Sequence, residues 1–262
     1  MNYDAIIVGA GPAGIFAALE LTGAGKRVLI VDKGRLIRER ICPIMAGQAD
    51  RCVNCPSCAV VSGWGGAGSA SDGKLTITTG YGGNLEEYVG TAELERLMKA
   101  VDDRFVADGA DPHLYEPSGQ NVHDTIRRAA AAGIKVLPAR IRHIGTDASR
   151  EVLDAMYRSL RDKCDILMNT FVQDILVENG AAVGVVTSDG TEHRAADVIA
   201  APGRDGASWL EGIVRRLKLP IASMPVDIGV RVELPAVVFS HLTDELYESK
   251  IVYRTEKFED NV

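Results

Sequence analysis

Three glycines and an aspartate near the start of the chain have the types and the spacing that bind phosphate groups and sugars. Gly9, Gly11 and Gly14 follow the first apolar run of the sequence, and Asp32 ends the second apolar run. In such a turn, the first glycine permits a sharp bend, the second lets a diphosphate approach the backbone, and the third lets a helix pack on the strand. A carboxylate at the position of Asp32 accepts hydrogen bonds from a ribose. The pattern predicts a strand, turn, helix and second strand that hold the ADP half of a dinucleotide, with a glycine-rich turn of another α/β protein as the alternative.

Four of the five cysteines form a second group, with the spacing of a metal centre. Cys42 precedes a proline, and two residues separate Cys52 from Cys55 and Cys55 from Cys58. The triplet together with a Cys-Pro pair resembles the ferredoxin arrangement for a [4Fe–4S] cluster, except that the Cys-Pro pair lies upstream. Four thiolates can equally hold a structural zinc ion, and a redox-active dithiol is a third option. We predict that these four cysteines ligate one centre, with a cluster as the first choice and with zinc or free thiols left open.

The composition of the 262-residue chain is that of a soluble globular protein, with 46% hydrophobic and 25% charged residues. The formal net charge of −7 argues against a nucleic acid or an anionic membrane as partner, because phosphate contacts need a basic surface. No apolar run reaches the roughly 18 residues of a transmembrane helix, and no basic segment precedes the first apolar run as in a signal peptide. We therefore expect a cytoplasmic protein without a transmembrane segment. Its clustered cysteines then suggest metal or redox chemistry rather than disulfides.

The first turn also resembles that of FAD-binding proteins of the glutathione reductase type. The resemblance rests on residues 8–14 and on Ala17 and Ala18. Pro12 and Ala13, between the second and third glycines, are less common in NAD dehydrogenases. FAD is therefore the first choice of cofactor, and NAD stays open. The basic residues after Asp32 are expected near the cofactor phosphates or the adenosine, or on a solvated turn. They are Arg35, Arg38 and Arg40, and Lys33 is expected among the cofactor-binding residues.

Residues 62–75 contain so many small side chains that they predict neither a stable helix nor a strand. Such a backbone can lie flat against a planar ligand and present N–H groups to it. In flavoproteins of the glutathione reductase type, the segment after the second strand passes beside the isoalloxazine ring, so the resemblance implies that this loop faces the flavin. A flexible linker is the alternative, although Trp64 and Leu75 offer apolar anchors. The cofactor-binding residues expected in this stretch are Gly65, Gly66, Ser71, Asp72, Gly73 and Lys74.

Longer stretches resemble a family of uncharacterised FAD-dependent dehydrogenases, relatives of geranylgeranyl reductases and electron-transfer-flavoprotein dehydrogenases. The resemblance is carried by the cysteine group and by residues 63–68, 71–75, 142–147, 201–204 and 226–231. It covers nearly the whole chain and implies a fold and a cofactor, but no substrate. Proteins of this family continue beyond the point at which this sequence stops, and in them a late Gly-Asp segment contacts the ribityl chain and the pyrophosphate. No Gly-Asp pair follows Gly203, so we expect part of the FAD site to be missing or supplied otherwise.

Apolar periodicity predicts the remaining elements. Helices are expected over residues 86–105, 122–132, 149–163 and 207–217, the third of them capped by Asp147. Strands are expected over residues 134–138, 165–169, 171–177, 181–187, 191–200 and 226–234. In a domain of this type, Val172 binds adenine through its backbone, and the turn at Pro202 and Gly203 meets the dinucleotide.

The predicted fold class is α/β, a Rossmann-like FAD/NAD(P)-binding domain with a β-meander and a partial second domain for the substrate. Residues 1–110 and 148–218 form the first domain, with a cysteine-rich insert at 42–58. Residues 111–147 and 219–262 form the partial substrate domain.

The reaction is predicted less directly than the cofactor. Arg140, Arg142 and His143 alternate with apolar residues, so their strand has one polar face that lines a substrate pocket or faces solvent. His143 and Lys74 are the candidate catalytic residues. The expected function is that of an FAD-dependent oxidoreductase, a dehydrogenase or reductase that exchanges electrons with a small-molecule substrate or an electron donor or acceptor. An iron–sulfur centre would relay the electrons. The alternatives are a non-catalytic or truncated dinucleotide- and metal-binding module and an NAD-bound enzyme resembling thiazole synthase.

Overall fold

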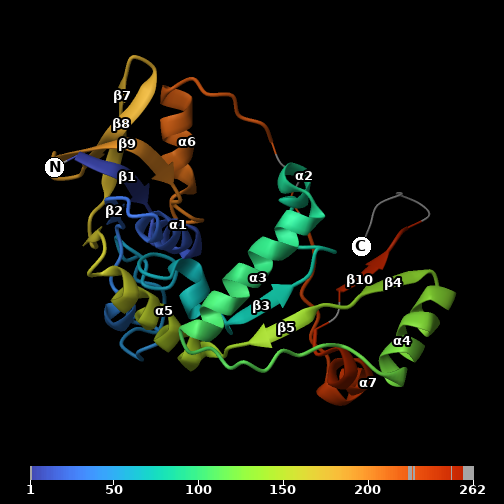
Figure 1. Ribbon diagram of the computed structural model, residues 1–262. Helices are drawn as coiled ribbons and strands as arrows, with labels where there is room; N and C mark the ends of the chain where they lie inside the picture. Colours follow the sequence, from blue (N-terminus) through green and yellow to red (C-terminus); the bar gives the residue numbers. More distant parts are fainter. Residues whose placement is uncertain (1, 224–225, 227, 249, 256–262) are drawn as a thin grey trace. The chain divides into compact units, whose positions relative to one another are not determined.

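The computed structural model describes residues 2–223, 226, 228–248 and 250–255 (Figure 1). The chain divides into two compact units, and each unit is made of two separate stretches of sequence. The first unit consists of Met1–Gly73 and Gly145–Ser223, and the second unit consists of Lys74–Ile144 and Met224–Val262.

The first unit is built on a six-stranded sheet in the order β6-β2-β1-β9-β8-β7. β1 (Asn2–Val8) runs parallel to β2 (Val28–Val31) on one side and to β9 (Glu192–Ala200) on the other. β6 (Asp165–Leu167) extends the parallel part beside β2, while β7 (Val172–Glu178) and β8 (Ala181–Thr187) form an antiparallel meander with β9. This arrangement confirms the predicted Rossmann-like sheet with a β-meander.

The apolar runs of β1 and β2 are unbroken because both faces of this sheet are covered. Ile6, Val8, Leu29 and Val31 pack in one cluster with residues of the meander. Side chains alternate along a strand, so the neighbouring residues, which are also fully buried, face the opposite side. The helices of this unit are α1 (Pro12–Gly23), α5 (Thr146–Leu160) and α6 (Ala207–Arg216), with 3₁₀ turns η1 (Ile37–Glu39) and η2 (Gly66–Ala70).

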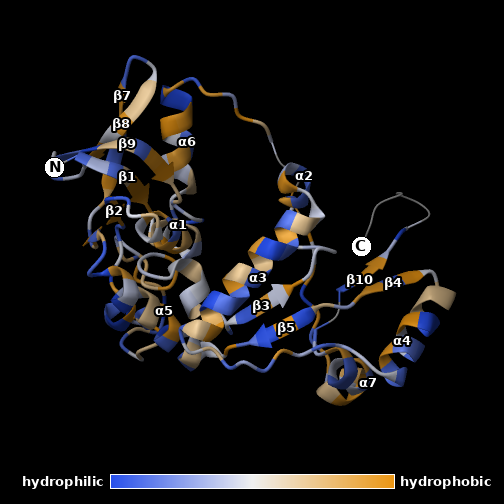
Figure 2. Cartoon of the chain, viewed as in Figure 1, coloured by the Kyte–Doolittle hydropathy of each residue, from blue (hydrophilic) through white to orange (hydrophobic). Residues whose placement is uncertain are grey.

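In the described part of the second unit, the strands form two antiparallel pairs. β3 (Lys74–Ile77) pairs with β5 (Arg140–His143), and β4 (Ile134–Leu137) pairs with β10 (Lys250–Tyr253). The helices are α2 (Glu86–Val89), α3 (Thr91–Ala107), α4 (Gln120–Ala131) and α7 (Ala236–Leu246). A small core joins α4, β4 and α7, and Figure 2 shows the apolar colouring of β4 and β10. None of the helices within the described residues combines the length and apolar character needed to cross a membrane.

The boundary between the units differs from the one predicted at residue 110. Residues 74–110 group with the second unit, because β3 pairs with β5 and because Asp102 of α3 binds Arg142 of β5. The other two divisions between the units fall after Ile144 and after Ser223, whereas the sequence predicts them near residues 147 and 218. A substrate-binding role for the second unit stays a prediction.

Three predicted elements also differ locally. The helix expected over residues 86–105 is divided at Gly90, whose φ of +79° ends α2 before α3 begins. Asp147 lies inside the first turn of α5 rather than at its cap, where its charge still faces the positive end of the helix dipole. The described residues of 226–234 form no strand. Val226, Ile228 and Val230 are 79%, 94% and 88% exposed, and no described strand pairs with this segment.

Candidate functional site

A cavity of about 240 Å³ opens at the carboxyl ends of β1, β2 and β9 in the first unit. Ligands of doubly wound folds bind at this edge of the sheet. The walls are the turn after β1, the end of β2, the start of the glycine loop (residues 63–73), the start of β7 and the turn before α6. Nine of the predicted cofactor-binding residues line this cavity: Gly9, Gly11, Pro12, Asp32, Lys33, Gly66, Val172, Pro202 and Gly203.

The remaining predicted cofactor-binding residues do not line this cavity. They are Ala13, Gly14, Gly65, Ser71, Asp72, Gly73 and Lys74. Ala13 lines a neighbouring hollow beside α6, and Gly14, Gly65 and Gly73 are buried. Ser71 donates to the carbonyl of Gly68 at 2.7 Å and so stabilises its own turn. Lys74 belongs to the second unit.

Close packing explains two of the three glycines in the turn after β1. A Cβ on Gly9, whose φ is +110°, would lie 2.1 Å from the carbonyl oxygen of Ala201, and one on Gly14 would lie 1.9 Å from the carbonyl oxygen of Gly9. Gly11 is different, because beyond its chain neighbours the nearest atom to such a Cβ is the Cα of Gly66, at 3.9 Å. Its missing side chain leaves room on the cavity side. α1 begins directly after Gly11, so the positive end of this helix faces that room.

The Asp32 carboxylate connects the end of β2 to the turn after β1. One oxygen accepts a hydrogen bond from the amide of Ala10 and the other accepts one from the amide of Gly34, both at 2.7 Å. Each carboxylate oxygen can accept a further hydrogen bond. Asp32 therefore holds the turn in place and still has the capacity to bind a ribose.

An ion pair that the sequence pattern did not indicate joins three walls of the cavity. Nζ of Lys33 lies 2.6 Å from Oδ2 of Asp205, and the hydroxyl of Ser62 donates a hydrogen bond to the same oxygen. The hydrogen bonds from Lys33 and then Ser62 lower the pKa of Asp205, so this carboxylate is charged at neutral pH. The partners lie 172 residues apart in sequence, which is why no local motif points to them.

The glycine loop is anchored to the body of the first unit. Trp64 is fully buried, and its indole N–H donates to the carbonyl of Leu153 at 2.8 Å. Its ring packs against that of Tyr157 in a T-shaped arrangement, with the two ring centres 5.3 Å apart. The amide of Gly65 donates to the carbonyl of Ala10 at 2.8 Å, which ties the loop to the turn after β1. These contacts favour a fixed cavity wall over the flexible linker left open by the sequence.

The three arginines expected near the phosphates do not line the cavity. Arg35 is exposed, and Arg38 pairs with Asp154 at 2.7 Å. Arg40 is buried, and its guanidinium donates to the backbone carbonyls of residues 59, 60, 64 and 66. This arginine therefore supports the glycine loop from behind.

The structure does not assemble the predicted metal centre. All five cysteines are free thiols. Within the described ranges, no three Cys, His, Asp or Glu side chains are placed to hold a metal ion. A centre formed by Cys42, Cys52, Cys55 and Cys58 rests on their sequence spacing. Cys164 differs from these four, because burial and then the charge of Asp165 raise the pKa of its thiol to about 11.

The two candidate catalytic residues lie opposite each other in the second unit. Lys74 and His143 are register partners across β3 and β5. Nδ1 of His143 shares a hydrogen bond with the hydroxyl of Tyr247, and Nζ of Lys74 lies 5.8 Å from the centre of the Tyr247 ring and 3.4 Å from Glu248. The side chains therefore form one polar cluster, but their catalytic role stays a prediction.

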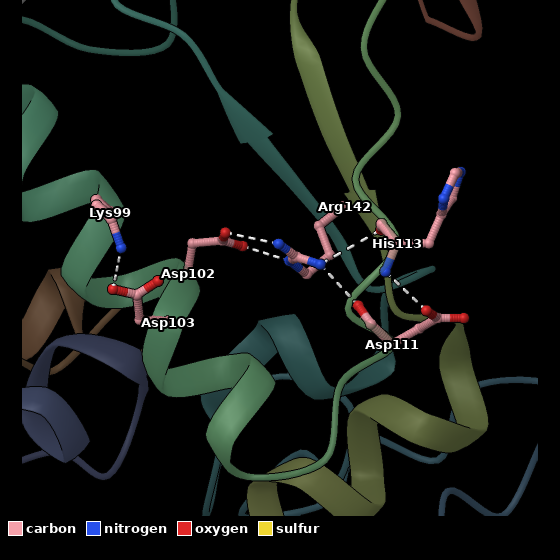
Figure 3. A network of polar contacts seen from close by, with 6 residues as sticks. All are labelled: Lys99, Asp102, Asp103, Asp111, His113 and Arg142. Atoms are coloured by element: carbon pink, nitrogen blue, oxygen red, sulfur yellow. Dashed lines mark hydrogen bonds and ion pairs between the residues drawn. The ribbon is translucent and has the colours of Figure 1, made fainter.

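Arg142 stabilises the second unit and is not available to an anionic substrate. Its side chain is 5% exposed, and its guanidinium binds both carboxylate oxygens of Asp102 (Figure 3). It also donates to the carbonyls of Asp111, at 2.7 Å, and His113, at 3.3 Å. The hydrogen bonds with Asp102 raise the pKa of Arg142 further. The prediction that this strand offers Arg142 to a substrate is therefore wrong.

Comparisons with known proteins identify the segment that forms the turn after β1. Residues 4–41 match the FAD binding domain family. The first unit has the Rossmann-like fold of FAD/NAD(P)-binding domains. A protein of Clostridium beijerinckii described as uncharacterized is 24% identical over 272 residues, which cover 98% of this chain and 43% of that protein. The chain thus spans less than half the length of this relative.

Solved structures that are similar over part of their length include an L-amino acid deaminase and a glycine oxidase. L-amino acid deaminase from Proteus myxofaciens is 15% identical with a TM-score of 0.46, over 84% of this chain and 49% of that chain. Glycine oxidase from Bacillus cereus is 21% identical with a TM-score of 0.48, over 82% of this chain and 59% of that chain.

Proposed function

We propose that the chain is the FAD-binding part of a flavin-dependent oxidoreductase acting on a small-molecule substrate or electron donor. The observation that carries this proposal is the turn after β1, which matches the FAD binding domain family and borders the cavity. Bound FAD supplies a ring that accepts and gives electron pairs or single electrons. Gly11 admits the diphosphate to the backbone, and the start of α1 stabilises its charge. Asp32 receives the ribose, and the backbone of Val172 receives the adenine.

FAD is preferred over NAD on two grounds. The Pro12-Ala13 pair follows the FAD type of turn, and the anchored glycine loop supplies a wall of small residues against which a large cofactor fits. NAD-bound enzymes of the thiazole synthase type share the first turn, so the released cofactor must be identified directly. Denaturation of the purified protein, followed by chromatography of the small molecules against FAD and NAD standards, makes that distinction. Recovery of NAD without flavin would contradict the preference.

Substitution of Gly11 tests whether this turn is the cofactor site. Gly11→Val should reduce the flavin-to-protein ratio at least tenfold, because the side chain would enter the space that the diphosphate needs. Gly23→Val, at the other end of α1, is the matched control, since a Cβ there meets no atom within 4 Å. The ratio is measured from flavin absorbance near ~450 nm against protein absorbance. A Gly11→Val protein that retains full flavin would refute the assignment.

A metal or cluster centre at Cys42, Cys52, Cys55 and Cys58 is a second proposal, supported by their spacing. A cluster there would relay single electrons, whereas zinc has no redox chemistry and would only stabilise the loop. Anaerobic purification with iron, sulfide and zinc analysis separates the two, and Cys55→Ser should lose whichever metal is present. Absence of both metals from a folded, anaerobically prepared protein would favour free thiols.

A further inference from the structure

Arg40 is a buried cation whose hydrogen bonds all go to backbone carbonyls. The residue is 6% exposed. Nε donates to Ala59 at 2.9 Å, Nη2 donates to Val60 at 2.8 Å, and Nη1 donates to Trp64 at 2.7 Å and to Gly66 at 2.9 Å. Among the described residues, no carboxylate forms an ion pair with it. Burial lowers the pKa of Arg40 to about 10, which still leaves the guanidinium charged at neutral pH.

One of the four carbonyls that Arg40 holds, that of Gly66, belongs to a residue of the cavity wall, and the other three belong to neighbouring residues of the same loop. Gly66 lines the cavity, and a Cβ on Gly66 would lie 3.1 Å from the Cα of Gly11. Arg40 does not line the cavity and therefore lies behind this wall. In a trans peptide the carbonyl and the N–H point in opposite directions. Because the carbonyl of Gly66 faces Arg40, the N–H of Ala67 faces away from it, and Ala67 also lines the cavity.

The charge of Arg40 is compensated differently from that of its basic neighbours. Lys33 is paired with Asp205, and Arg38 is paired with Asp154. The guanidinium of Arg40 is solvated by carbonyl dipoles, which satisfy its donors. It forms no ion pair among the described residues, although the charge of Asp32 stabilises the cation and that of Arg150 opposes it. A charge in a buried, low-dielectric position acts on other charges over a longer distance than one in water. The diphosphate of a dinucleotide bound at Gly11 would bring negative charge to the opposite side of this wall.

We propose that Arg40 is a positioning residue for the FAD site, which fixes the cavity wall at Gly66 and keeps a positive charge behind it without touching the diphosphate. This inference rests on the proposed function, since it assumes that the cavity holds the ADP half of FAD. It predicts that the affinity for ADP depends on the positive charge at position 40 as well as on the hydrogen bonds of its side chain.

Three variants separate charge from hydrogen bonding. Arg40→Lys keeps the charge with fewer donors, Arg40→Gln keeps amide donors without the charge, and Arg40→Met removes both. The matched control is Arg38→Met, two residues away, because the Arg38 side chain is 73% exposed and does not line the cavity. The dissociation constant for ADP is measured by isothermal titration calorimetry on the full chain after removal of any flavin. Far-UV circular dichroism establishes that each variant is folded.

The expected result is that Arg40→Lys and Arg38→Met bind ADP within threefold of the parent protein, whereas Arg40→Gln and Arg40→Met bind at least tenfold more weakly. The inference is overturned if Arg40→Gln binds as tightly as the parent, or if Arg40→Lys loses as much affinity as Arg40→Gln. It is also overturned if every Arg40 variant fails to fold, because Arg40 would then serve folding rather than the site. A parent protein that binds neither ADP nor FAD would instead refute the proposed function.

Discussion

Asp32 shows how one carboxylate can serve both the fold and the ligand site. Both of its oxygens already accept hydrogen bonds from backbone amides of the two turns that border the cavity. A motif-based view assigns this residue to the ribose alone. The two hydrogen bonds show that Asp32 also stabilises the fold before any ligand binds. The structural role and the binding role can therefore be tested separately.

Asp32→Asn should destabilise the first unit even without ligand. The amide group replaces an acceptor with a donor that faces a backbone N–H, so we expect a loss of about 1–3 kcal/mol in the free energy of unfolding. Both tryptophans, Trp64 and Trp209, belong to the first unit, so urea unfolding followed by tryptophan emission reports on it. Asp4→Asn is the control, because Asp4 also accepts one backbone amide hydrogen bond, at an exposed site, and should cost less. Equal stability of Asp32→Asn and the parent would show that Asp32 serves only the ligand.

Cys164 should react far more slowly with iodoacetamide than the other four cysteines. The thiolate is the reactive form, and a pKa raised to about 11 means that it accumulates only as the pH rises through that value. At pH 8, in protein treated with a chelator to remove any bound metal, we expect the other four thiols to be alkylated rapidly and Cys164 to remain, as shown by mass spectrometry of the peptides. Protein unfolded in guanidinium is the control and should expose all five. Rapid alkylation of Cys164 in the native protein would contradict the raised pKa of its thiol.

At the scale of secondary-structure elements, an ion pair with little exposure to solvent joins α3 to β5. Arg142 of β5 binds Asp102 on α3 and the carbonyls of Asp111 and His113 (Figure 3). One side chain thus connects the strand to the helix and to the loop that follows the helix. Asp103, the next residue of α3, pairs instead with Lys99 at 2.5 Å on the surface. The two neighbouring aspartates thus provide a buried and an exposed version of the same interaction.

Asp102→Asn should cost about 3–5 kcal/mol in the free energy of unfolding, because it leaves the buried guanidinium of Arg142 without its counter-charge. Asp103→Asn should cost at most about 1 kcal/mol, since exposed ion pairs contribute little. Urea unfolding of both variants, followed by far-UV circular dichroism, gives the comparison. Similar losses for the two variants would indicate that the Arg142 network does not stabilise the second unit.

The elements that sequence could predict are those whose cause is local. The turn from Gly9 to Gly14 and the strand before it follow from glycine spacing and an apolar run, and both are present. The Lys33–Asp205 and Arg142–Asp102 pairs join residues 172 and 40 positions apart, so their existence depends on the complete fold. The polar strand at Arg140–His143 was predicted, but alternation could not reveal that Arg142 turns toward α3. Over residues 226–234 the alternating pattern predicts a strand, but the described residues there form none. Such a pattern forms a strand only where a partner strand supplies hydrogen bonds.

For the whole molecule, the important feature is that every residue lining the cavity at the turn after β1 belongs to the first unit. That unit is assembled from two distant stretches of sequence, since β9 returns to pair with β1 and carries the turn with Pro202 and Gly203 to the cavity. The second unit has its own small core of α4, β4 and α7. A ligand that occupies only this cavity should therefore stabilise the chain unevenly.

ADP should slow amide hydrogen exchange around the cavity and leave the core of the second unit unchanged. A ligand that binds the native state suppresses the opening of the segments that contact it. We expect protection in residues 9–14, 62–68 and 201–206, all of which contribute to the cavity, and none in α4 or β4. Exchange is followed by mass spectrometry of peptides from the full chain with and without ADP, and Gly11→Val with ADP is the control that should show no protection. Protection of α4 and β4 without protection of the turn after β1 would place the ADP site outside this cavity.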